Sequence, residues 1–565
     1  MFKVHIELHG MQAFLFSVPR LRSMIGANVL LGETVRCRMR EKAKSGCVSL
    51  AGDEYKEIAQ LHPEHDPDDP LSSSEGVDDP RALFLEGILA RDGGHFAAVF
   101  KSKDEIARFQ KEIEPLIASE LPGVTIDWKI TDLSKPPKEN QVDLSKIPQR
   151  GIELVHLPWF QVCQETGHDP AVEVITYPRE EIRFVSQTAA KTHHKGDAFF
   201  RNQGKDIISL LKDQLPLKDL QAPVTVQDLC AGGYLAVIHA DGNGVGKRFK
   251  DWQKRCEKEI NDRFANEPMV KQNLAREAYG ERFYHGMRVA VRQAVIEALK
   301  STFHEYEGKY QPYQLLMLGG DDLLMICQAK YALAFIVDYA RALSTRPLAD
   351  GQPLTIGAGV VISKPNLPFH RLQDVADELA SSAKQRFRNS AVPASVVDWM
   401  VVTQSETESP EAARRRDQWI CYKVNDQIEE LALSVRPCLV LGEQPDSLEF
   451  LLKKAEALRA GIGKTKEEDP LGKQGRAARS QLRYLASILN QGRRFADLAW
   501  LDLPDATRET LAEALGIPPN GPDGVGSLWQ RVPESGNRWK TSLADLVELY
   551  EISALGGKGD NGHDQ

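Results

Sequence analysis

The sequence predicts an α+β protein with two ferredoxin-like domains, a small connector domain and a C-terminal α-helical domain. Its 565 residues are too many for one hydrophobic core and correspond to three or four domains of about 150 residues each. Along the chain, the repeat period of the apolar residues switches between two residues, as in strands, and 3.6 residues, as in helices. This indicates a mixture of strands and helices. A pattern of strand, Gly-Gly turn and strand occurs twice, which indicates an internal repeat.

The composition is that of a globular protein. Apolar residues make up 42% of the chain and charged residues 27%, and the mean hydropathy is −0.37. No run reaches the roughly 18 uncharged apolar residues of a membrane span, and the opening MFKVHIELHG alternates like a strand, unlike a signal peptide. We therefore expect a cytoplasmic protein with no membrane partner. The eight cysteines form no CxxC pair, and the net charge of −9 argues against nonspecific coating of nucleic acid.

The first copy of the repeat opens with a strand predicted at residues 2–9 (FKVHIELH). After a long insertion, GILARDGGHFAAVF at 87–100 has the pattern of strand, Gly-Gly turn and strand, and a helix is expected to begin at Lys103. The first copy thus contains an opening strand, a hairpin and a helix.

The second copy opens with a strand at 233–240 (GYLAVIHA), and its hairpin is PYQLLMLGGDDLLMIC at 312–327. Apolar residues at helical spacing lie between them, which predicts a helix. Further strands are expected at 353–363 and 395–402, with a helix between them. The order βαββαβ is typical of a ferredoxin-like, palm-type sheet. The later helix should have one apolar face, formed by Leu372, Val375, Ala376, Leu379 and Ala383.

These patterns divide the chain into four predicted domains. Residues 1–150 would form a first, degenerate palm, which includes an acidic Pro- and Ser-rich linker at 61–80. We expect this linker to remain unordered because it cannot bury enough apolar surface. Residues 151–230 would form the connector, 231–404 the second palm and 405–565 the helical domain.

The turn Gly319-Gly320-Asp321-Asp322 is the strongest candidate for chemistry. A Gly-Gly turn between apolar strands is by default only a tight hairpin. Here the strands LLML and LLMI would hold two neighbouring carboxylates rigidly at the tip, where they repel each other. The motif therefore predicts a bound cation.

Asp241 is predicted to lie beside this hairpin, because VIHADGNGVGK places it at the end of an apolar strand. In a βαββαβ sheet the first strand neighbours the hairpin, so Asp241 would face Asp321 across about 4.8 Å. That geometry suits two Mg²⁺ or Mn²⁺ ions, one activating a ribose 3′-hydroxyl and one binding a triphosphate. Asp322 is either a third metal ligand or a residue that contacts the ligands without binding the metal itself. The alternative role for Asp241 is the start of a glycine turn, where Asn would serve equally well.

The residues after Asp241 form a candidate phosphate site. The glycines leave backbone N–H groups open to phosphate oxygens, and a lysine adds positive charge. A second lysine, in SSAKQRF, is either another phosphate ligand or an ordinary solvated side chain. The candidate nucleotide-binding residues are Gly242, Asn243, Gly244, Gly246, Lys247, Gly319, Gly320 and Lys384.

These motifs resemble the large palm-domain subunit of type III CRISPR effector complexes, over most of the chain. The segment VHIELHGMQAFLFSVPRLRSMIGANVLLGE is similar to the family's first palm, and DGGHFAAVF to its degenerate hairpin. The segments ADGNGVGK and LGGDDLLMI are similar to the active second palm. IGAGVVISK, SSAKQRF and PASVVDWMVV are similar to its later strands and helix. The order of the motifs makes the resemblance more specific than GGDD alone.

The resemblance implies that Asp241, Asp321 and Asp322 bind the catalytic metals and that ATP is the substrate. It also implies partners, namely the other subunits of an RNA-guided complex together with guide RNA and target RNA. Three departures limit it. No HD nuclease domain precedes the first palm, so we expect no DNase activity. In QVCQETGHDPAV, with Cys163, we expect the turn of the family's zinc site without its metal. Asn243 stands where relatives often have an acid, which leaves open the number of ligands per metal.

We therefore expect a nucleotidyltransferase that converts ATP to a cyclic oligoadenylate or a related adenylate signal in antiviral defence. Attack of a 3′-hydroxyl on an ATP α-phosphate would release pyrophosphate, with catalysis supplied by positioning and metal electrostatics. Two alternatives remain open: a stand-alone palm enzyme that makes a cyclic dinucleotide, and a catalytically idle scaffold subunit. The presence of all three acidic residues argues against the scaffold.

Overall fold

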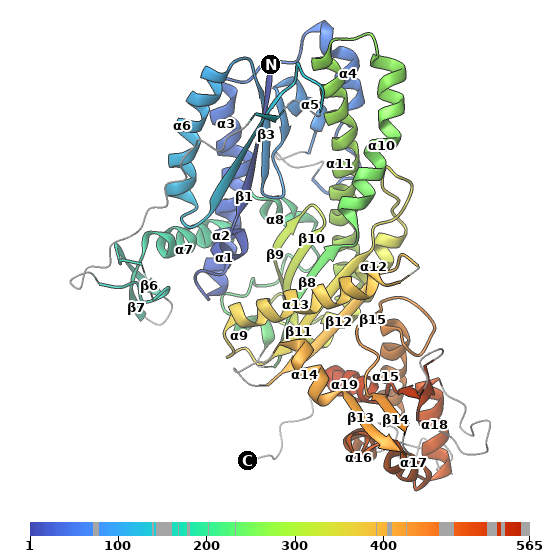
Figure 1. Cartoon of the computed structure of the whole chain (residues 1–565). Helices are drawn as coiled ribbons and strands as arrows, with labels where there is room; N and C mark the ends of the chain where they lie inside the picture. Colours follow the sequence, from blue (N-terminus) through green and yellow to red (C-terminus); the bar gives the residue numbers. More distant parts are fainter. Residues whose placement is uncertain are drawn as a thin grey trace.

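The structure is a computed structural model, shown in Figure 1. It describes residues 1–71, 78–137, 141–142, 161–167, 169–177, 181–201, 203–231, 233–390, 392–403, 409–424, 427–462, 479–516, 528–532 and 537–554. No helix in these ranges is both long and apolar enough to span a membrane.

The first sheet contains five strands in the order β2-β3-β1-β4-β5. The central strand β1 pairs antiparallel with β3 on one side and β4 on the other. Its inward side chains, Val4 and Ile6, are fully buried. The strand bounds are β1 (Phe2–His9), β2 (Ile88–Ala90), β3 (His95–Phe100), β4 (Thr125–Asp132) and β5 (Gln141–Val142).

The helix predicted to begin at Lys103 is α6 (Lys103–Glu120), which is preceded by a capping box formed by Ser102 and Glu105. The insertion between β1 and β2 is mainly helical. It contains α1 (Met11–Leu15), α2 (Leu21–Glu33), a π-helical turn (Thr34–Arg38), α3 (Met39–Lys44), a 3-10 turn (Asp53–Tyr55), α4 (Lys56–Leu61) and α5 (Pro80–Leu85).

The expectation that the acidic linker 61–80 cannot order itself is wrong for the parts that the structure describes, 61–71 and 78–80. Leu71 is fully buried, and the carboxylates of Asp69 and Asp78 are almost completely buried. Both bind arginines of the second domain, as detailed below. The prediction failed because the linker is ordered by buried charge pairs with another domain, which composition alone does not reveal.

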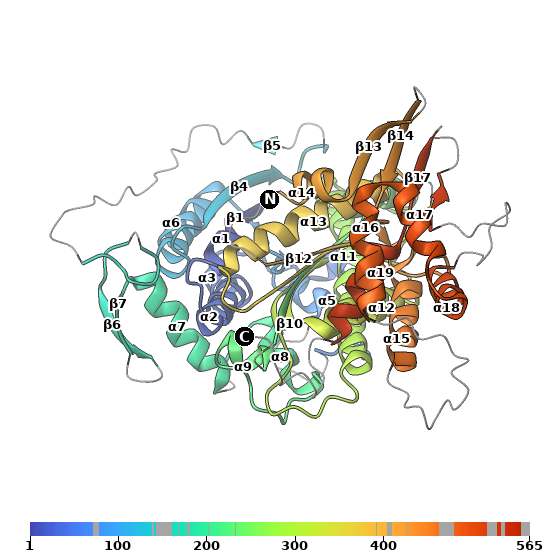
Figure 2. The same cartoon turned by 90° about the horizontal axis from the view of Figure 1, so that it is seen from below.

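The connector contains a two-stranded sheet, β6 (Glu173–Tyr177) and β7 (Glu181–Val185), that projects from the body of the molecule in both views (Figures 1 and 2). The turn expected at Cys163 is present, with Gly167 N–H donating to the Cys163 carbonyl at 2.9 Å. The connector's α7 packs closely on α2, because a Cβ on Gly26 would lie 1.7 Å from the Thr192 carbonyl oxygen. The connector helices are α7 (Gln187–Phe200), α8 (Ile207–Leu211) and α9 (Val226–Cys230), and a 3-10 turn spans Lys212–Gln214.

The second sheet contains six strands in the order β15-β12-β11-β8-β10-β9. The run β11-β8-β10-β9 repeats the order β4-β1-β3-β2 of the first sheet, so the predicted repeat of one ferredoxin-like unit is confirmed. The strand bounds are β8 (Leu235–Gly242), β9 (Tyr313–Gly319), β10 (Asp322–Gln328), β11 (Ile356–Ser363), β12 (Val396–Val402) and β15 (Cys438–Leu439).

Four long helices accompany this sheet: α10 (Val245–Phe264), α11 (Met269–Thr302), α12 (Ala329–Ser344) and α13 (Phe369–Arg388). α11 and α12 pack against each other on one face, and α13 covers β8, β11 and β12 on the other (Figure 2). The predicted apolar face of α13 is buried as expected. β8 therefore lies in the middle of the sheet with helices on both faces.

The C-terminal region is less purely helical than predicted, because four short strands form a sheet in the order β13-β14-β17-β16. The inward face of β14 carries the buried Glu429, which pairs with Arg493 at 2.8 Å, so the segment lacks the apolar alternation of an ordinary strand. The strands are β13 (Trp419–Val424), β14 (Gln427–Ala432), β16 (Gln530–Arg531) and β17 (Arg538–Lys540). The helices are α14 (Pro410–Asp417), α15 (Leu448–Ile462), α16 (Arg479–Ile488), α17 (Arg493–Leu501), α18 (Asp505–Leu515) and α19 (Leu543–Ala554), and a 3-10 turn spans Leu489–Gln491.

A buried cation joins this region to the second sheet. The Arg436 guanidinium lies 4.7 Å from the centre of the Trp399 ring on β12 and pairs with Asp545 of α19 at 2.8 Å. Both charged side chains are nearly inaccessible to water, so breaking one partner would leave the other uncompensated.

Candidate active site

The three acids singled out from the sequence meet at one end of two central strands of the second sheet, β8 and β10. Asp241 is the penultimate residue of β8, and Asp322 is the first residue of β10. Leu323 pairs with Ala240, so the next pair along the two strands brings Asp322 opposite Asp241. Asp321 lies in the turn between β9 and β10. One carboxylate oxygen from each of the three lies within 4.8 Å of the others.

The hairpin turn depends on its glycines. Gly320 has a φ of +61°, a conformation that side chains with a Cβ rarely adopt. Gly242, at the end of β8, leaves room for the hairpin, because a Cβ there would lie 2.7 Å from Oδ2 and 2.8 Å from Cβ of Asp321. The two glycines therefore allow the acidic tip and the strand end to approach closely.

Burial disfavours the charged form of both hairpin acids. Burial, reinforced by the neighbouring Asp322 carboxylate, raises the pKa of Asp321 to about 6. Burial also raises the pKa of Asp322, an effect that His239 opposes and Asp377 reinforces. Nearby negative charge without matching positive charge is the condition that a bound cation relieves.

Lys384 lies directly at this cluster, as its position on α13 predicted, although its partner is an acid. Its ammonium donates to Oδ2 of Asp241 in a close ion pair, and its side chain is about a quarter exposed. Burial, with a smaller effect from Arg388, lowers the pKa of Lys384. A purely solvated lysine is therefore excluded, and the ammonium lies where a phosphate next to Asp241 could reach it.

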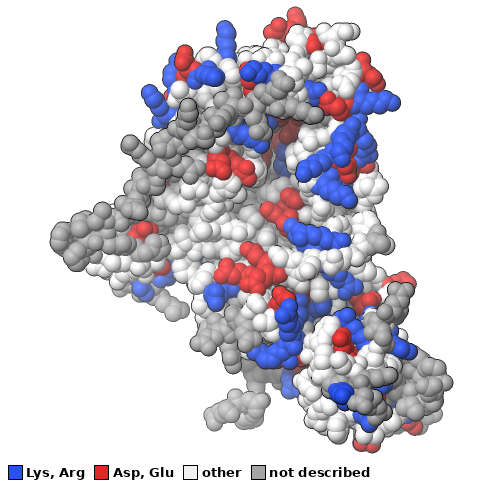
Figure 3. All heavy atoms as spheres, in the orientation of Figure 1, with Lys and Arg blue, Asp and Glu red and all other residues white. Residues whose placement is uncertain are grey.

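The loop after β8 leads directly into α10. Gly244, with a φ of +65°, precedes the first helical residue, and Gly246 and Lys247 lie exposed in the first turn. The open N-terminus of a 20-residue helix presents unpaired N–H groups and a partial positive charge. Exposed lysines including Lys247 and Lys250 cluster over α10 (Figure 3). These features suit an anionic ligand.

Asn243 is placed differently from the other loop residues. It is 2% exposed, its backbone N–H donates to Thr355 at 2.7 Å, and its side-chain amide donates weakly to the Ala394 carbonyl at 3.5 Å. A Cβ on Gly357 would lie 3.1 Å from its Oδ1. Asn243 is therefore buried, and its Oδ1 lies beside Gly357, the same position that the stem of Lys384 contacts and the register partner of Asp241.

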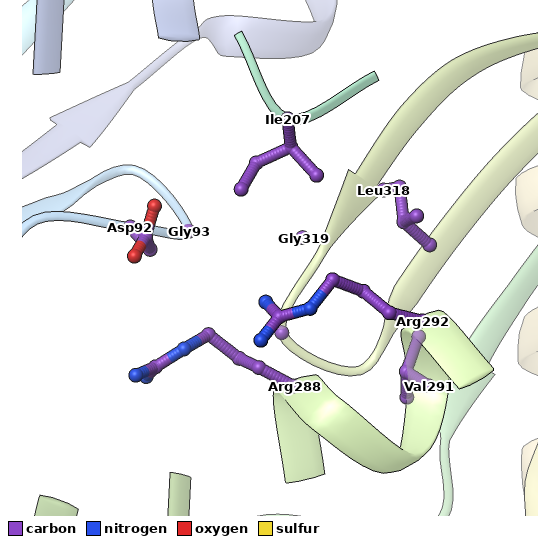
Figure 4. A pocket seen from close by; sticks show the side chains of 9 residues that line it. Asp92, Gly93, Ile207, Arg288, Val291, Arg292, Leu318 and Gly319 are labelled. Carbon is purple, nitrogen blue, oxygen red and sulfur yellow. The ribbon is translucent and has the colours of Figure 1, made fainter. Parts of the chain in front are cut away.

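The tips of the two hairpins meet. Gly93 of the first sheet's hairpin lies close to Gly319, since a Cβ on Gly319 would be 3.8 Å from its Cα. A small cavity lies between the tips, with Arg288 and Arg292 of α11 along one wall (Figure 4). The first repeat thus contributes surface next to the acidic hairpin.

The cavity arginines are already neutralised by acids. Arg292 binds Asp69 at 2.6 Å and Asp78 at 3.0 Å, and Arg288 binds Asp78 at 2.9 Å and Glu281 at 2.6 Å. Asp69 and Asp78 could hold a metal together with His285, as the second group of this kind in the described residues. Because guanidinium groups already bind both carboxylates, we assign this cluster a structural role and not a metal-binding one.

His239 and Asp377 were missed in the sequence. His239 is 9% exposed in β8, with Nδ1 2.5 Å from Oδ1 of Asp377 on α13. A single polar residue inside the apolar run LAVIHA was the available signal. Helical spacing was a second signal, because Asp377 precedes Lys384 by seven residues, or two turns.

Residues 234–392 match the family model described as Cas10/Cmr2, second palm domain. This range contains all of the candidate site residues. No curated protein sequence matches the chain.

Solved structures of type III CRISPR complexes are similar to the chain. A Csm1-Csm4 cassette in complex with pppApApA has 13% identity and a TM-score of 0.44, covering 98% of this chain and 69% of that chain. The apo state of a type III-B Cmr-beta complex has 9% identity and a TM-score of 0.46, covering 98% and 81%. A Csm1-Csm4 cassette in complex with AMPPNP has 11% identity and a TM-score of 0.35, and the chain spans 53% of that protein's length.

Proposed function

Because residues 234–392 form a second palm domain of the Cas10/Cmr2 type, we propose that the chain is the palm subunit of a type III CRISPR-like effector and converts ATP to a cyclic oligoadenylate. The observation that carries the proposal is the convergence of Asp241, Asp321 and Asp322 within 4.8 Å at the end of the central strands of that domain. The substrate and product follow from the family resemblance.

The acidic residues at this end of β8 and β10 fit a pair of hard divalent cations. Three carboxylates offer the oxygen ligands that Mg²⁺ and Mn²⁺ prefer. The pKa values of Asp321 and Asp322 are raised, mainly by burial and also by neighbouring carboxylates, and a bound cation would stabilise their charged forms. Bound cations would polarise the attacking 3′-hydroxyl and neutralise charge on the triphosphate. Asp241, Asp321 and Asp322 would hold them, with Asp322 as a ligand because it lies opposite Asp241.

The other residues of the site would bind and orient the nucleotide. The N–H groups at the start of α10, including those of Gly244 and Gly246, would donate hydrogen bonds to phosphate oxygens, and Lys247 would add positive charge. Lys384 would exchange its contact with Asp241 for a phosphate once the carboxylate is engaged elsewhere. Gly319 and Gly320 keep side chains away from the tip. Catalysis would then depend mainly on positioning and electrostatics.

We propose that the chain works with other subunits of an RNA-guided complex, with guide RNA and target RNA bound through that complex. The two alternative functions make different predictions. A stand-alone cyclic-dinucleotide synthase would act without partners or RNA and release a two-nucleotide ring. A scaffold would make no product under any condition.

The test is mass spectrometry of products formed from ATP and Mg²⁺ by the purified chain, alone and in its assembled complex with guide and target RNA. We expect cyclic oligoadenylate from the assembled complex and none from a complex carrying both Asp321→Asn and Asp322→Asn. Asp251→Asn, an exposed acid on α10 of the same domain, is the matched control and should remain active. Equal product from the double variant would contradict the site assignment.

A further inference from the structure

Two polar contacts join α13 to β8. One is the ion pair of Lys384 with Asp241, and the other is the contact of Asp377 with His239. His239 and Asp241 are two residues apart on a strand, so their side chains leave the same face of the sheet. Asp377 and Lys384 are seven residues apart, so they share one side of the helix. The two contacts therefore join α13 to β8 at two separate positions along the helix and the strand.

The helix is held tightly against the sheet at the same two levels. A Cβ on Gly359 of β11 would lie 2.0 Å from the Ala376 carbonyl oxygen, beside Asp377. A Cβ on Gly357 would lie 2.7 Å from Cγ of Lys384. Gly357 is the register partner of Asp241, so the stem of Lys384 crosses the sheet directly beside the acid that its ammonium reaches.

The contact between His239 and Asp377 is unusual for its surroundings. His239 is flanked in β8 by Ile238 and Ala240, both fully buried, and Asp377 also accepts a hydrogen bond from Gln373 at 2.9 Å. Burying the His239 ring here costs free energy that an apolar side chain would avoid, whereas Asp377 is about a third exposed. The close approach of the His239 ring nitrogen to the Asp377 carboxylate ties one position on β8 to one position on α13, which apolar packing does less well.

We propose that His239 and Asp377 are positioning residues that fix α13 along β8 and thereby hold the Lys384 ammonium at the Asp241 carboxylate. The inference rests on the proposed function only in the roles it gives Asp241 and Lys384 during turnover. The geometric part concerns the free protein. His239 and Asp377 would act through Lys384 and would not themselves contact the nucleotide.

The geometric part is tested by the rate at which an amine-reactive reagent modifies Lys384, measured by peptide mass spectrometry without nucleotide. In Asp377→Asn and His239→Gln we expect Lys384 to be labelled about fivefold faster than in the unaltered protein, the factor expected when one polar contact is lost. Asp374→Asn is the matched control, because Asp374 lies one turn earlier on α13 in an exposed pair with Arg371. Its Lys384 labelling should be unchanged.

The functional part is tested by a double-mutant cycle on turnover of ATP, combining Asp377→Asn with Lys384→Met. If Asp377 acts through Lys384, the double variant should be no slower than Lys384→Met alone. Losses that multiply would overturn the positioning role. If the protein proves inactive toward ATP, the labelling arm still decides the geometry. Unchanged labelling in folded Asp377→Asn and His239→Gln would refute the proposal whatever the activity.

Discussion

Asp241 lies in the middle of a six-stranded sheet, where Gly357 of β11 pairs with it and Asp322 of β10 lies opposite. Its carboxylate contacts Lys384 and lies within 4.8 Å of both hairpin acids. A residue that merely starts a turn needs neither the negative charge nor these neighbours. The proposed ligand role and the turn role therefore predict opposite effects of replacing the acid by its amide.

Asp241→Asn should reduce turnover of ATP by about a hundredfold or more, because it removes a charged ligand without changing volume. Mn²⁺ should restore more activity than Mg²⁺, since it suits the remaining carboxylate and water ligands and binds more tightly in most sites. Initial rates across a titration of each metal would measure this. Near-normal turnover at low Mg²⁺ would support the turn role instead.

Glu281 is a second side chain whose charge is set by its surroundings. It lies on α11 beside Arg288, which is already paired with Asp78. Burial therefore outweighs the attraction of Arg288 and raises the pKa of Glu281 to about 7. The folded state holds this proton more tightly than the unfolded chain does, so the favourable contribution to stability is complete at low pH and is lost as the pH rises through about 7.

Glu281→Gln should remove this pH dependence. The melting temperature of the variant, relative to that of the unaltered protein, should rise between pH 5 and pH 8, reflecting on the order of 3 kcal/mol from a pKa raised from 4.5 to about 7. Thermal melts at several pH values would show this. Glu277→Gln, at an acid of the same helix with a more exposed Lys3 pair, is the control. If the difference in melting temperature between Glu281→Gln and the unaltered protein stays constant with pH, Glu281 does not have the raised pKa described here.

Helix α11 neutralises buried charge from a distant segment of the chain, residues 61–80. Its arginines neutralise Asp69 and Asp78 of the 61–80 segment, and its apolar side packs on α12. Arg292 is 3% exposed, as buried as the two acids it binds. Removing a buried cation leaves its partners uncompensated, which costs much more than losing an exposed pair.

Arg292→Met should destabilise the protein by about 3–5 kcal/mol, measured as a shift of the first unfolding transition in denaturant. Arg341→Met is the comparison, because its pair with Asp338 lies on the surface of α12 and should matter by about 1 kcal/mol or less. Equal shifts in the two variants would show that the buried pairs do not hold the 61–80 segment in place.

Much of the second domain could be predicted from the sequence because its elements follow simple periodicities. The apolar runs around Asp241 and Asp321 identify strands, and the face of α13 follows from the spacing of its apolar residues. Contacts between distant segments leave no such pattern. The burial of Asp78 against Arg288 depends on an interface between domains, and the partner of His239 comes from a helix almost 140 residues later. β14 was missed because its buried face carries Glu429.

The whole molecule brings two copies of one sheet together at their hairpin tips. Gly93 and Gly319 approach closely (Figure 4), and only the second tip carries the acidic pair Asp321 and Asp322. A second nucleotide bound near the acids would therefore lie against the first repeat. The C-terminal region is fixed to the same domain through the contact of Arg436 with Trp399.

We propose that Asp241, Asp321 and Asp322 together hold divalent cations that act on a nucleotide. Anomalous diffraction from crystals grown with Mn²⁺ and a non-hydrolysable ATP analogue tests it most directly. We predict two manganese peaks at about 2.0–2.4 Å from carboxylate oxygens of these residues, with the triphosphate against the start of α10. A fully bound nucleotide with no manganese at the three carboxylates, or manganese bound at a different cluster, would contradict the claim.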